Sequence, residues 1–170
     1  MRNSEFKAAF EEYKDAVYRF AWRMMGSAAA AEDIAQDVFL SLLRHPGRFD
    51  PNRGNLRPFL LGITRNLVLK RWRDEHQWEE LLDEQVSAKP IDLERSEKAE
   101  IVGAAVRSLP PLQREVLILF EYEELSLEEI ARAVEAEVGT VKSRLHRARE
   151  NLRRMLAPLK SSNGVRSWNR

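Results

Sequence analysis

The chain has 170 residues, of which 44% are apolar, with 28 Lys and Arg against 27 Asp and Glu and no Cys. This length suits one compact domain or two small ones. The sequence has no apolar run of the roughly 20 residues that a membrane span needs, and its first residues lack the apolar core of a signal peptide. We therefore expect a soluble, cytoplasmic protein without membrane insertion, and the lack of Cys excludes disulfides, thiolate catalysis and Cys-ligated metals.

The charges are distributed unevenly, although they sum to only +1. Residues 44 to 73 carry eight basic residues and one acid, and residues 138 to 170 carry nine and one, whereas residues 83 to 137 carry six basic residues and 14 acids. Two basic blocks in a nearly neutral chain indicate two contacts on one long anion, with nucleic acid as the leading candidate. The alternative is that both blocks are solvated helix faces. The acidic stretch suits a protein partner or plain solvent better than DNA.

Helical periodicity extends through almost the whole sequence, and no segment alternates in the manner of a half-buried strand. The expected fold is all-α, with two small helical domains joined by a flexible linker. In the first half we expect helices over 4–25, 29–44 and 55–82, with a shaped loop over 45–55 that is rich in Pro, Gly and Asn. In the second half we expect four helices, over 93–107, 111–122, 127–134 and 139–157, the last stopped by Pro158. The linker is placed over 83–92 and a basic tail over 159–170.

The last two expected helices carry matching apolar stripes, separated by a short break. The stripes consist of Leu127, Ile130, Ala131 and Val134, and of Val141, Leu145, Ala148 and Leu152. Ser126 and Glu129 add a capping-box pattern at the start of the first of these helices. Two short helices that bury such stripes against each other form a helix-turn-helix, whose second helix enters the DNA major groove. The alternative is a helix pair that packs as a simple bundle.

Polar residues opposite the apolar stripe of 139–157 are predicted to contact DNA. Near the start of the helix they are candidate readers of base edges: Lys142, Ser143, His146 and Arg147. Candidate phosphate contacts are Arg144, Arg149 and Arg153. His146 is interpreted as DNA-facing and not as a metal ligand, because neither Cys nor an acidic cluster accompanies it. We expect no metal, no cofactor and no catalytic residue.

A second stripe on the helix expected over 55–82 combines an aromatic ring, an amide and cations. It consists of Phe59, Gly62, Asn66, Lys70 and Arg73, with Arg65 beside it. Cations that follow phosphates and a ring that stacks on a base are typical of single-stranded DNA binding. The preceding loop adds Arg48, Phe49, Asn52 and Arg53, which suit a pocket for a flipped base. The alternative is that Phe59 belongs to the ordinary core.

The helix expected over 29–44 carries one apolar residue on its polar side. Ile34, Val38 and Leu42 face inward by periodicity, whereas Leu40 lies among Asp33, Gln36 and Asp37. An exposed Leu ringed by acids and an amide indicates a protein contact. Singly exposed Leu residues are also common, which is the alternative.

Several of these segments resemble the extracytoplasmic-function (ECF) RNA polymerase sigma factors of the sigma-70 family. The similar segments are Ala31 to Phe39, Arg57 to Asn66, Leu109 to Val116, Ser126 to Ala131 and Gly139 to Arg149. The resemblance implies that residues 1–82 form a region 2-like domain, which binds core polymerase and melts and reads the −10 element. It implies that residues 93–158 form a region 4-like domain, which reads the −35 element. Core polymerase, through its β′ clamp, promoter DNA and an anti-sigma factor are the implied partners.

Three positions depart from the pattern of the family. Phe59 stands where Trp is common, and Lys70 stands where an acid is common. Val134 to Glu137 replaces a turn that usually contains Gly, so a left-handed backbone there would cost about 1 kcal/mol or more.

The resulting hypothesis is a dissociable promoter-recognition subunit that is not itself an enzyme. A free-standing helix-turn-helix regulator, which would bind duplex DNA as a dimer without polymerase, is the alternative. A nucleic-acid hydrolase would need metal ligands or a nucleophile, and the sequence offers no recognisable set.

Overall fold

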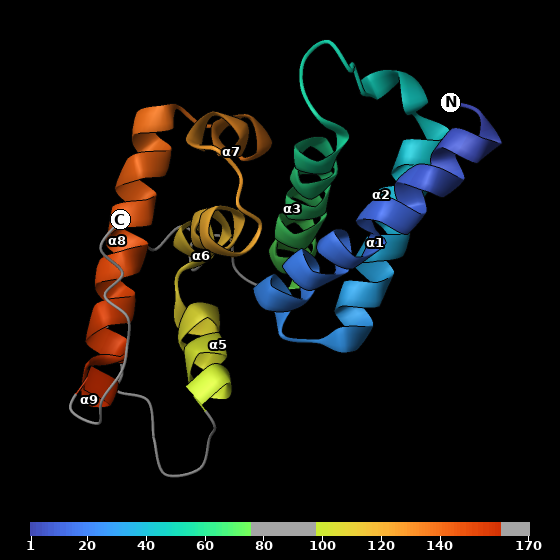
Figure 1. Cartoon of the computed structure of the whole chain (residues 1–170). Coiled ribbons are helices and arrows are strands. Elements are labelled where there is room, and N and C mark those ends of the chain that lie inside the picture. The colour runs from blue at the N-terminus through green and yellow to red at the C-terminus, as the bar shows by residue number, and fades with distance from the viewer. Residues whose placement is uncertain (76–97, 161–170) are drawn as a thin grey trace.

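The structure is a computed structural model, in which residues 1–75 and 98–160 are described (Figure 1). Across these two ranges the regular secondary structure is entirely helical, as predicted. No helix of the described ranges is both long enough and apolar enough to cross a membrane. The predicted linker over 83–92 lies outside the described residues, as do 76–82, 93–97 and the end of the basic tail.

The N-terminal half consists of three long helices and one short 3-10 turn. These are α1 (Asn3–Met25), α2 (Ala28–Arg44), η1 (Pro46–Arg48) and α3 (Leu56–Glu75). Gly26 ends α1 with a left-handed backbone (φ 69°), which a residue without Cβ adopts readily. Ser27 then caps α2, because its hydroxyl accepts a hydrogen bond from the Ala30 N–H at 3.2 Å. The tight α1–α2 connection positions Phe20 and Leu42 in a shared core, where both are buried.

The C-terminal half contains the predicted helices and one additional short helix. These are α5 (Lys98–Ser108), α6 (Pro111–Leu117), η2 (Ile118–Tyr122), α7 (Leu127–Ala133), α8 (Val138–Met155) and α9 (Ala157–Lys160). Pro111 occupies the first turn of α6, where its missing N–H costs nothing. The prediction that Pro158 stops the last long helix is wrong. Instead α8 ends at Met155, because Leu156 leaves helical geometry (φ −97°, ψ 3°), and Pro158 lies within α9.

The end of the helix predicted over 111–122 is wound more loosely than an α-helix. Residues Ile118–Tyr122 form a π-helical turn, in which the Glu123 N–H donates to the Ile118 carbonyl at 3.1 Å. Glu124 follows with a left-handed backbone (φ 56°), which is unfavourable for a residue with a side chain. Such π turns recur at functional sites, and here the turn directs Glu123 toward the N-terminal half.

The two halves pack against each other. Helix α3 lies beside α7, and the end of α1 approaches α5 and α6 (Figure 1). Buried apolar side chains of both halves form one continuous cluster, which includes Leu60 and Leu61 of α3 and Ile130 and Ala131 of α7. The expected two domains are therefore present, and they share a core across their boundary.

Candidate nucleic-acid interface

A cleft of about 560 Å³ lies between the 45–55 loop, α3 and α7. Five residues predicted to hold a DNA strand line it: Arg48, Phe49, Arg53, Phe59 and Asn66. The Phe49 and Phe59 rings lie 5.4 Å apart with 50° between their planes. Phe59 is half-buried, so it packs on the core and also faces the cleft. The structure thus brings the loop and the helix to one concavity, whose walls carry aromatic rings and charges of both signs.

The other residues predicted on this surface lie around the cleft. Asn52 is exposed in the loop, where its N–H donates to Asp50 Oδ1 at 2.9 Å. Lys70 and Arg73 are exposed on the last turns of α3 and do not line the cleft. The surface that combines loop and helix is therefore longer than the concavity itself.

Arg65 does not lie on an exposed ridge in this arrangement. Its guanidinium binds both carboxylate oxygens of Glu115, with Nε at 2.7 Å and Nη2 at 3.1 Å, and its side chain is only 12% exposed. The Glu115 side chain is fully buried. Arg65 thus joins α3 to α6 across the boundary between the halves.

The helix-turn-helix has the predicted internal packing. Ile130 of α7 and Val141, Leu145 and Leu152 of α8 are all buried, and α7 packs against α8. At the start of α7 the Ser126 hydroxyl accepts from the Glu129 N–H at 3.1 Å, and the Glu129 carboxylate accepts from the Ser126 N–H at 3.0 Å. The predicted capping box is therefore confirmed.

The outward face of α8 carries most of the predicted DNA contacts. Lys142, Ser143, His146 and Arg147 are exposed there, whereas Arg144 and Arg153 are half-buried.

Arg149 faces the body of the C-terminal half. Its Nη2 lies 2.8 Å from Glu121 Oε1, and its guanidinium lies 5.1 Å from the centre of the Phe120 ring. In this arrangement Arg149 links α8 to η2.

The turn between α7 and α8 contains a residue with a left-handed backbone, in the segment where the family usually has Gly. Glu135 has φ 54°, at the position where a Gly would be unstrained. Its N–H reaches the Arg132 carbonyl at 3.4 Å, and the Ala136 N–H donates to the Ala131 carbonyl at 3.0 Å. These contacts close the end of α7 and set the start of α8.

The exposed face of α2 contains the residues predicted to bind protein. Asp33, Gln36, Asp37 and Leu40 are all exposed, with Leu40 at 41%. Leu43, three residues further along, is 52% exposed and extends the apolar spot by one turn. Sequence reasoning missed Leu43, although its spacing from Leu40 was a usable signal.

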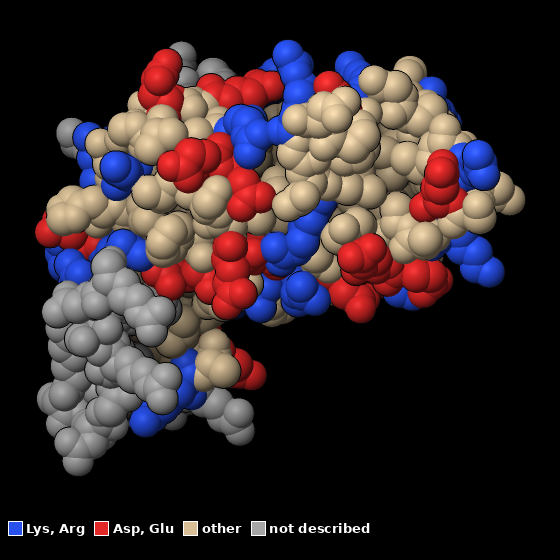
Figure 2. All heavy atoms as spheres, turned by 45° about the horizontal axis from the view of Figure 1, so that its top comes forward, with Lys and Arg blue, Asp and Glu red and all other residues tan. Residues whose placement is uncertain are grey.

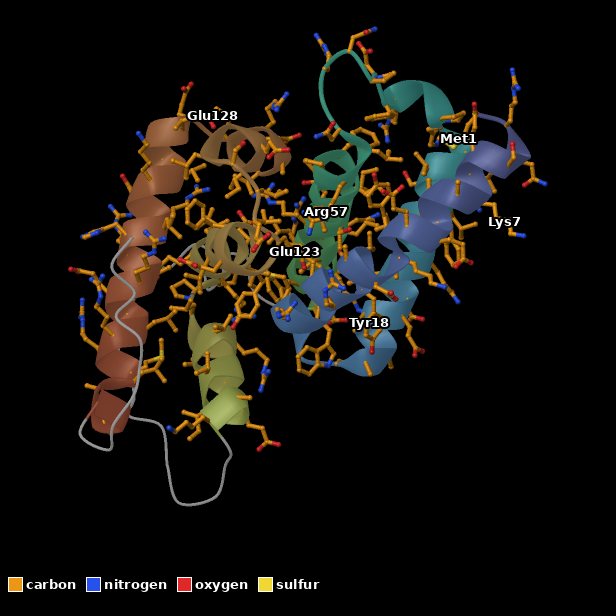
Figure 3. All side chains as sticks on the ribbon, viewed as in Figure 1. Met1, Lys7, Tyr18, Arg57, Glu123 and Glu128 are labelled. Carbon is orange, nitrogen blue, oxygen red and sulfur yellow. The ribbon has the colours of Figure 1, made fainter. Side chains whose placement is uncertain are left out.

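Sequence reasoning also missed a buried carboxylate, Glu123, which joins the two halves. Arg57 of α3 reaches it with Nη2 at 2.5 Å from Oε2 and with Nη1 at 2.6 Å from the Glu123 carbonyl. Figure 3 shows Arg57 and Glu123 facing each other between α3 and α6. Arg19 and Arg23 of α1 lie 3.7 and 3.8 Å from the same carboxylate. Part of the acidic stretch therefore does face protein, and that protein is the first half of the same chain.

At this boundary, burial shifts the pKa of Glu115 and of Arg114. It raises the pKa of Glu115 above its ordinary value, while the hydrogen bond and charge of Arg65 act in the opposite direction. It lowers the pKa of Arg114 to about 10, with a smaller contribution from the nearby charge of Arg107. Arg114 still donates to the Met24 carbonyl at 2.5 Å, so it fastens α6 to the end of α1.

Both signs of charge are mixed on the surface above the cleft. Figure 2 shows Lys and Arg interspersed with Asp and Glu on the side that carries the top of Figure 1. The cleft itself is lined by cations of the loop and by Glu129 and Glu135 of the C-terminal half. A DNA phosphate backbone that entered this cleft would meet charges of both signs.

Two family matches cover most of the described helices, in the order expected. Residues 9–79 match Sigma-70 region 2, and residues 99–152 match Sigma-70 region 4.

Known proteins resemble the chain over most of its length. It is 36% identical to the ECF RNA polymerase sigma factor SigE of Mycolicibacterium smegmatis, over 86% of this chain and 59% of that protein. It is 34% identical to the ECF RNA polymerase sigma factor SigW of Bacillus subtilis, over 86% of each chain. The sigma factor RpoE of Bartonella quintana, solved with the anti-sigma factor NepR, has a TM-score of 0.70 at 28% identity and covers 90% of this chain and 97% of that one. CnrH, solved with the cytosolic domain of CnrY, shares the fold with a TM-score of 0.69 at 20% identity over 96% of this chain and 92% of its own. The chain therefore belongs to the ECF RNA polymerase sigma factors of the sigma-70 family.

Proposed function

We propose that this chain directs core RNA polymerase to a specific set of promoters by reading a −35 duplex and holding the opened −10 strand. The observation that carries the proposal is that one chain presents two separate surfaces with the residue types that bind DNA. One surface is the outward face of α8, and the other is the loop and cleft in front of α3. A protein that binds two sites on one promoter needs two such surfaces. In this proposal, polymerase supplies the covalent chemistry and the chain itself catalyses no reaction.

The −35 duplex is assigned to the outward face of α8. The N-terminal turns of that helix carry the exposed side chains Lys142, Ser143, His146 and Arg147. An Arg in the major groove pairs with a guanine edge, and each such contact contributes about 1 to 3 kcal/mol of discrimination. Arg144 and Arg149 serve as phosphate contacts once Arg149 exchanges its Glu121 partner for DNA.

The opened −10 strand is assigned to the loop and α3. Phe59 offers a stacking face for a base, and Arg48, Phe49, Asn52 and Arg53 surround the entrance. Asn66, Lys70 and Arg73 follow along α3 as phosphate and base contacts, and Arg65 joins them once it exchanges its Glu115 partner for DNA. Stacking contributes about 1 to 3 kcal/mol per base, which offsets the loss of about one or two duplex steps at about 1.4 kcal/mol each. Strand opening then needs no nucleotide hydrolysis by this chain.

Core polymerase is assigned to the exposed face of α2. Leu40 supplies the apolar centre, and Asp33, Gln36 and Asp37 supply a polar rim. In this proposal residues 1–82 act as the polymerase and −10 unit and residues 93–158 as the −35 unit.

We further propose an anti-sigma protein as a regulatory partner and the cytoplasm as the site of action. The similarity to RpoE of Bartonella quintana, which was solved with an anti-sigma factor, supports such a partner. The proposed binding to core polymerase supports the cytoplasm as the site of action.

Transcription in vitro tests the proposal. Core polymerase is incubated with fragments of the source genome, with and without the purified chain, and the 5′ ends of the transcripts are mapped. We expect discrete start sites that depend on the chain and share sequences near −35 and −10. If polymerase starts at the same places with and without the chain, the proposal is wrong.

A gel-shift assay with the chain alone separates the alternative. A free-standing regulator binds duplex DNA tightly and specifically without polymerase, whereas the proposed subunit gains specific binding only within the holoenzyme.

A further inference from the structure

We propose that the two halves form a closed, self-inhibited state, in which α7 covers the strand-binding surface of α3 and Glu123 holds the halves together. The proposal rests on the proposed function, because the covered surface is the one assigned there to the −10 strand. It adds a state of the free chain that must open before DNA is captured.

The central contact is a carboxylate of one half inside a set of guanidinium groups of the other. The Glu123 side chain is fully buried, and Arg57, Arg19 and Arg23 supply the charges around it. Because α1 and α3 contribute these arginines and the C-terminal half contributes the acid, the contact exists only when the halves are together. We call this group the Glu123 latch.

The geometry of the latch makes it releasable. Oε2 is tightly bound by Arg57, but Oε1 is buried without a hydrogen-bond partner in the described part of the chain and lies 3.8 Å from Arg23 Nη1. A buried carboxylate recovers its lost hydration only if both oxygens are satisfied. The backbone adds a second cost, since the π turn and the left-handed Glu124 hold Glu123 in place. The closed state is therefore held by a contact that is only partly compensated.

Three further polar contacts cross the same boundary. Arg65 binds Glu115, Arg114 donates to the Met24 carbonyl, and Arg132 donates to the Arg53 carbonyl. Charged groups are abundant at contacts that form and separate, whereas permanent interfaces are more apolar. The boundary also contains buried apolar side chains of both halves, so separating the halves breaks contacts of both kinds.

Closure covers the centre of the strand-binding surface. A Cβ placed on Gly62 would lie 3.4 Å from the Ala133 backbone, so α7 rests directly on α3. Glu129 and Glu135 also line the cleft beside Arg48 and Phe59, together with Arg132, so the C-terminal half adds two acids and one base, and the acids repel phosphates. A DNA strand can follow α3 only after α7 has moved away.

The other proposed surfaces stay open in the closed state. Leu40 and Asp37 on α2 are exposed, and so are His146 and Arg147 on α8. Closure therefore covers the surface proposed for strand capture, while the residues proposed to bind polymerase and the −35 duplex remain exposed.

A reversible cross-link tests whether closure inhibits. The chain has no Cys, so Gly62→Cys together with Ala133→Cys introduces the sole thiols. The built Cβ of residue 62 lies 3.7 Å from Ala133 Cβ, within the range of about 3.5 to 4.5 Å found in disulfides. We expect the oxidised holoenzyme to open the promoter less than the same double variant reduced with dithiothreitol, as measured by permanganate reactivity of unpaired thymines. The two single variants serve as controls and respond to neither treatment.

The outcomes separate this proposal from the proposed function. Full promoter opening by the cross-linked chain overturns the closed-state proposal and leaves the proposed function intact. Failure of the wild-type chain to support any promoter opening overturns the proposed function instead.

A second variant tests the latch without a cross-link. Glu123→Gln removes the charge at nearly unchanged volume, and Glu124→Gln is a matched control, because Glu124 is adjacent and exposed. Small-angle X-ray scattering of the full chain measures the radius of gyration, about 16 Å for a compact chain of this length. We expect Glu123→Gln to increase the radius and Glu124→Gln to leave it at the wild-type value. Equal radii for all three chains overturn the role of Glu123.

Discussion

At Glu115, a carboxylate is held inside the molecule by one guanidinium. Burial raises its pKa above the ordinary value, and Arg65 and Arg144 only partly oppose the shift. The native chain therefore keeps this proton at pH values where the unfolded chain has lost it. The contribution of Glu115 to stability is fully present below the ordinary glutamate pKa and is lost as pH rises through the native pKa.

A Glu115→Gln variant removes this titration. The free energy of unfolding of the wild type, relative to that of the variant, should increase as pH is lowered from about 7 to about 5. Urea denaturation at the two pH values measures it. A difference that stays constant between the two pH values would contradict the assignment.

Arg147 is a charged residue whose proposed role is to contact DNA. We expect Arg147→Ala to weaken holoenzyme binding to the −35 duplex by about 1 to 3 kcal/mol and to relax preference at one base pair. Arg154→Ala is the matched control, since it removes the same charge from α8 at a side chain that is 67% exposed. Competition binding with promoter fragments changed at single −35 positions measures both effects. Equal losses for the two variants, with preference unchanged, would remove Arg147 from the base readers.

At the scale of elements, the sequence was sufficient to predict those helix ends that depend on a capping side chain or on a Gly. The Ser126 capping box, the Gly26 stop and the apolar stripes of α7 and α8 depend on residues a few positions apart, so periodicity and capping rules were sufficient. The π turn at η2 was not predictable in this way. It is tied to the placement of Glu123, whose partner Arg57 is 66 residues away.

The turn between α7 and α8 provides a prediction about stability. Glu135 holds a left-handed backbone at φ 54°, so Glu135→Gly should stabilise the chain by about 1 kcal/mol, after the greater freedom of Gly in the unfolded chain is subtracted. Thermal unfolding measures the change. Glu137→Gly is the control, because Glu137 has an ordinary φ of −68° and the substitution should not stabilise. A destabilised Glu135→Gly variant would show that the Glu side chain contributes more than the strain costs.

At the scale of the whole molecule, the sequence indicated the contents of each half but not how the halves meet. The charge blocks and motifs identified the cationic loop, the outward face of α8 and Leu40 on α2. They did not reveal that Arg65 pairs with Glu115 or that Arg149 pairs with Glu121, because a linear pattern shows which residues are charged and not which ones meet. As a result, two arginines predicted on DNA surfaces are paired with acids of the same chain, Arg65 across the boundary between the halves and Arg149 within the C-terminal half.

Separate surfaces for polymerase and DNA lead to a further prediction. Replacing Asp37 and Leu40 together by Ala should weaken core-polymerase binding by about 2 kcal/mol, roughly 30-fold, without changing the radius of gyration. Fluorescence anisotropy with labelled chain measures the affinity. Phe10→Ala removes a comparably exposed apolar side chain from α1 and should leave the affinity unchanged. Wild-type affinity in the double variant would show that α2 does not bind polymerase.

The π turn also makes the contact between the halves sensitive to chain length. Each residue of an α-helix rotates the chain by about 100°, so deleting one residue from Ile118–Tyr122 would rewind the turn and swing the acid that follows it away from its arginines. A single-codon deletion would thus convert a self-restrained protein into a constitutively receptive one, although Glu123 and the arginines around it all remained encoded.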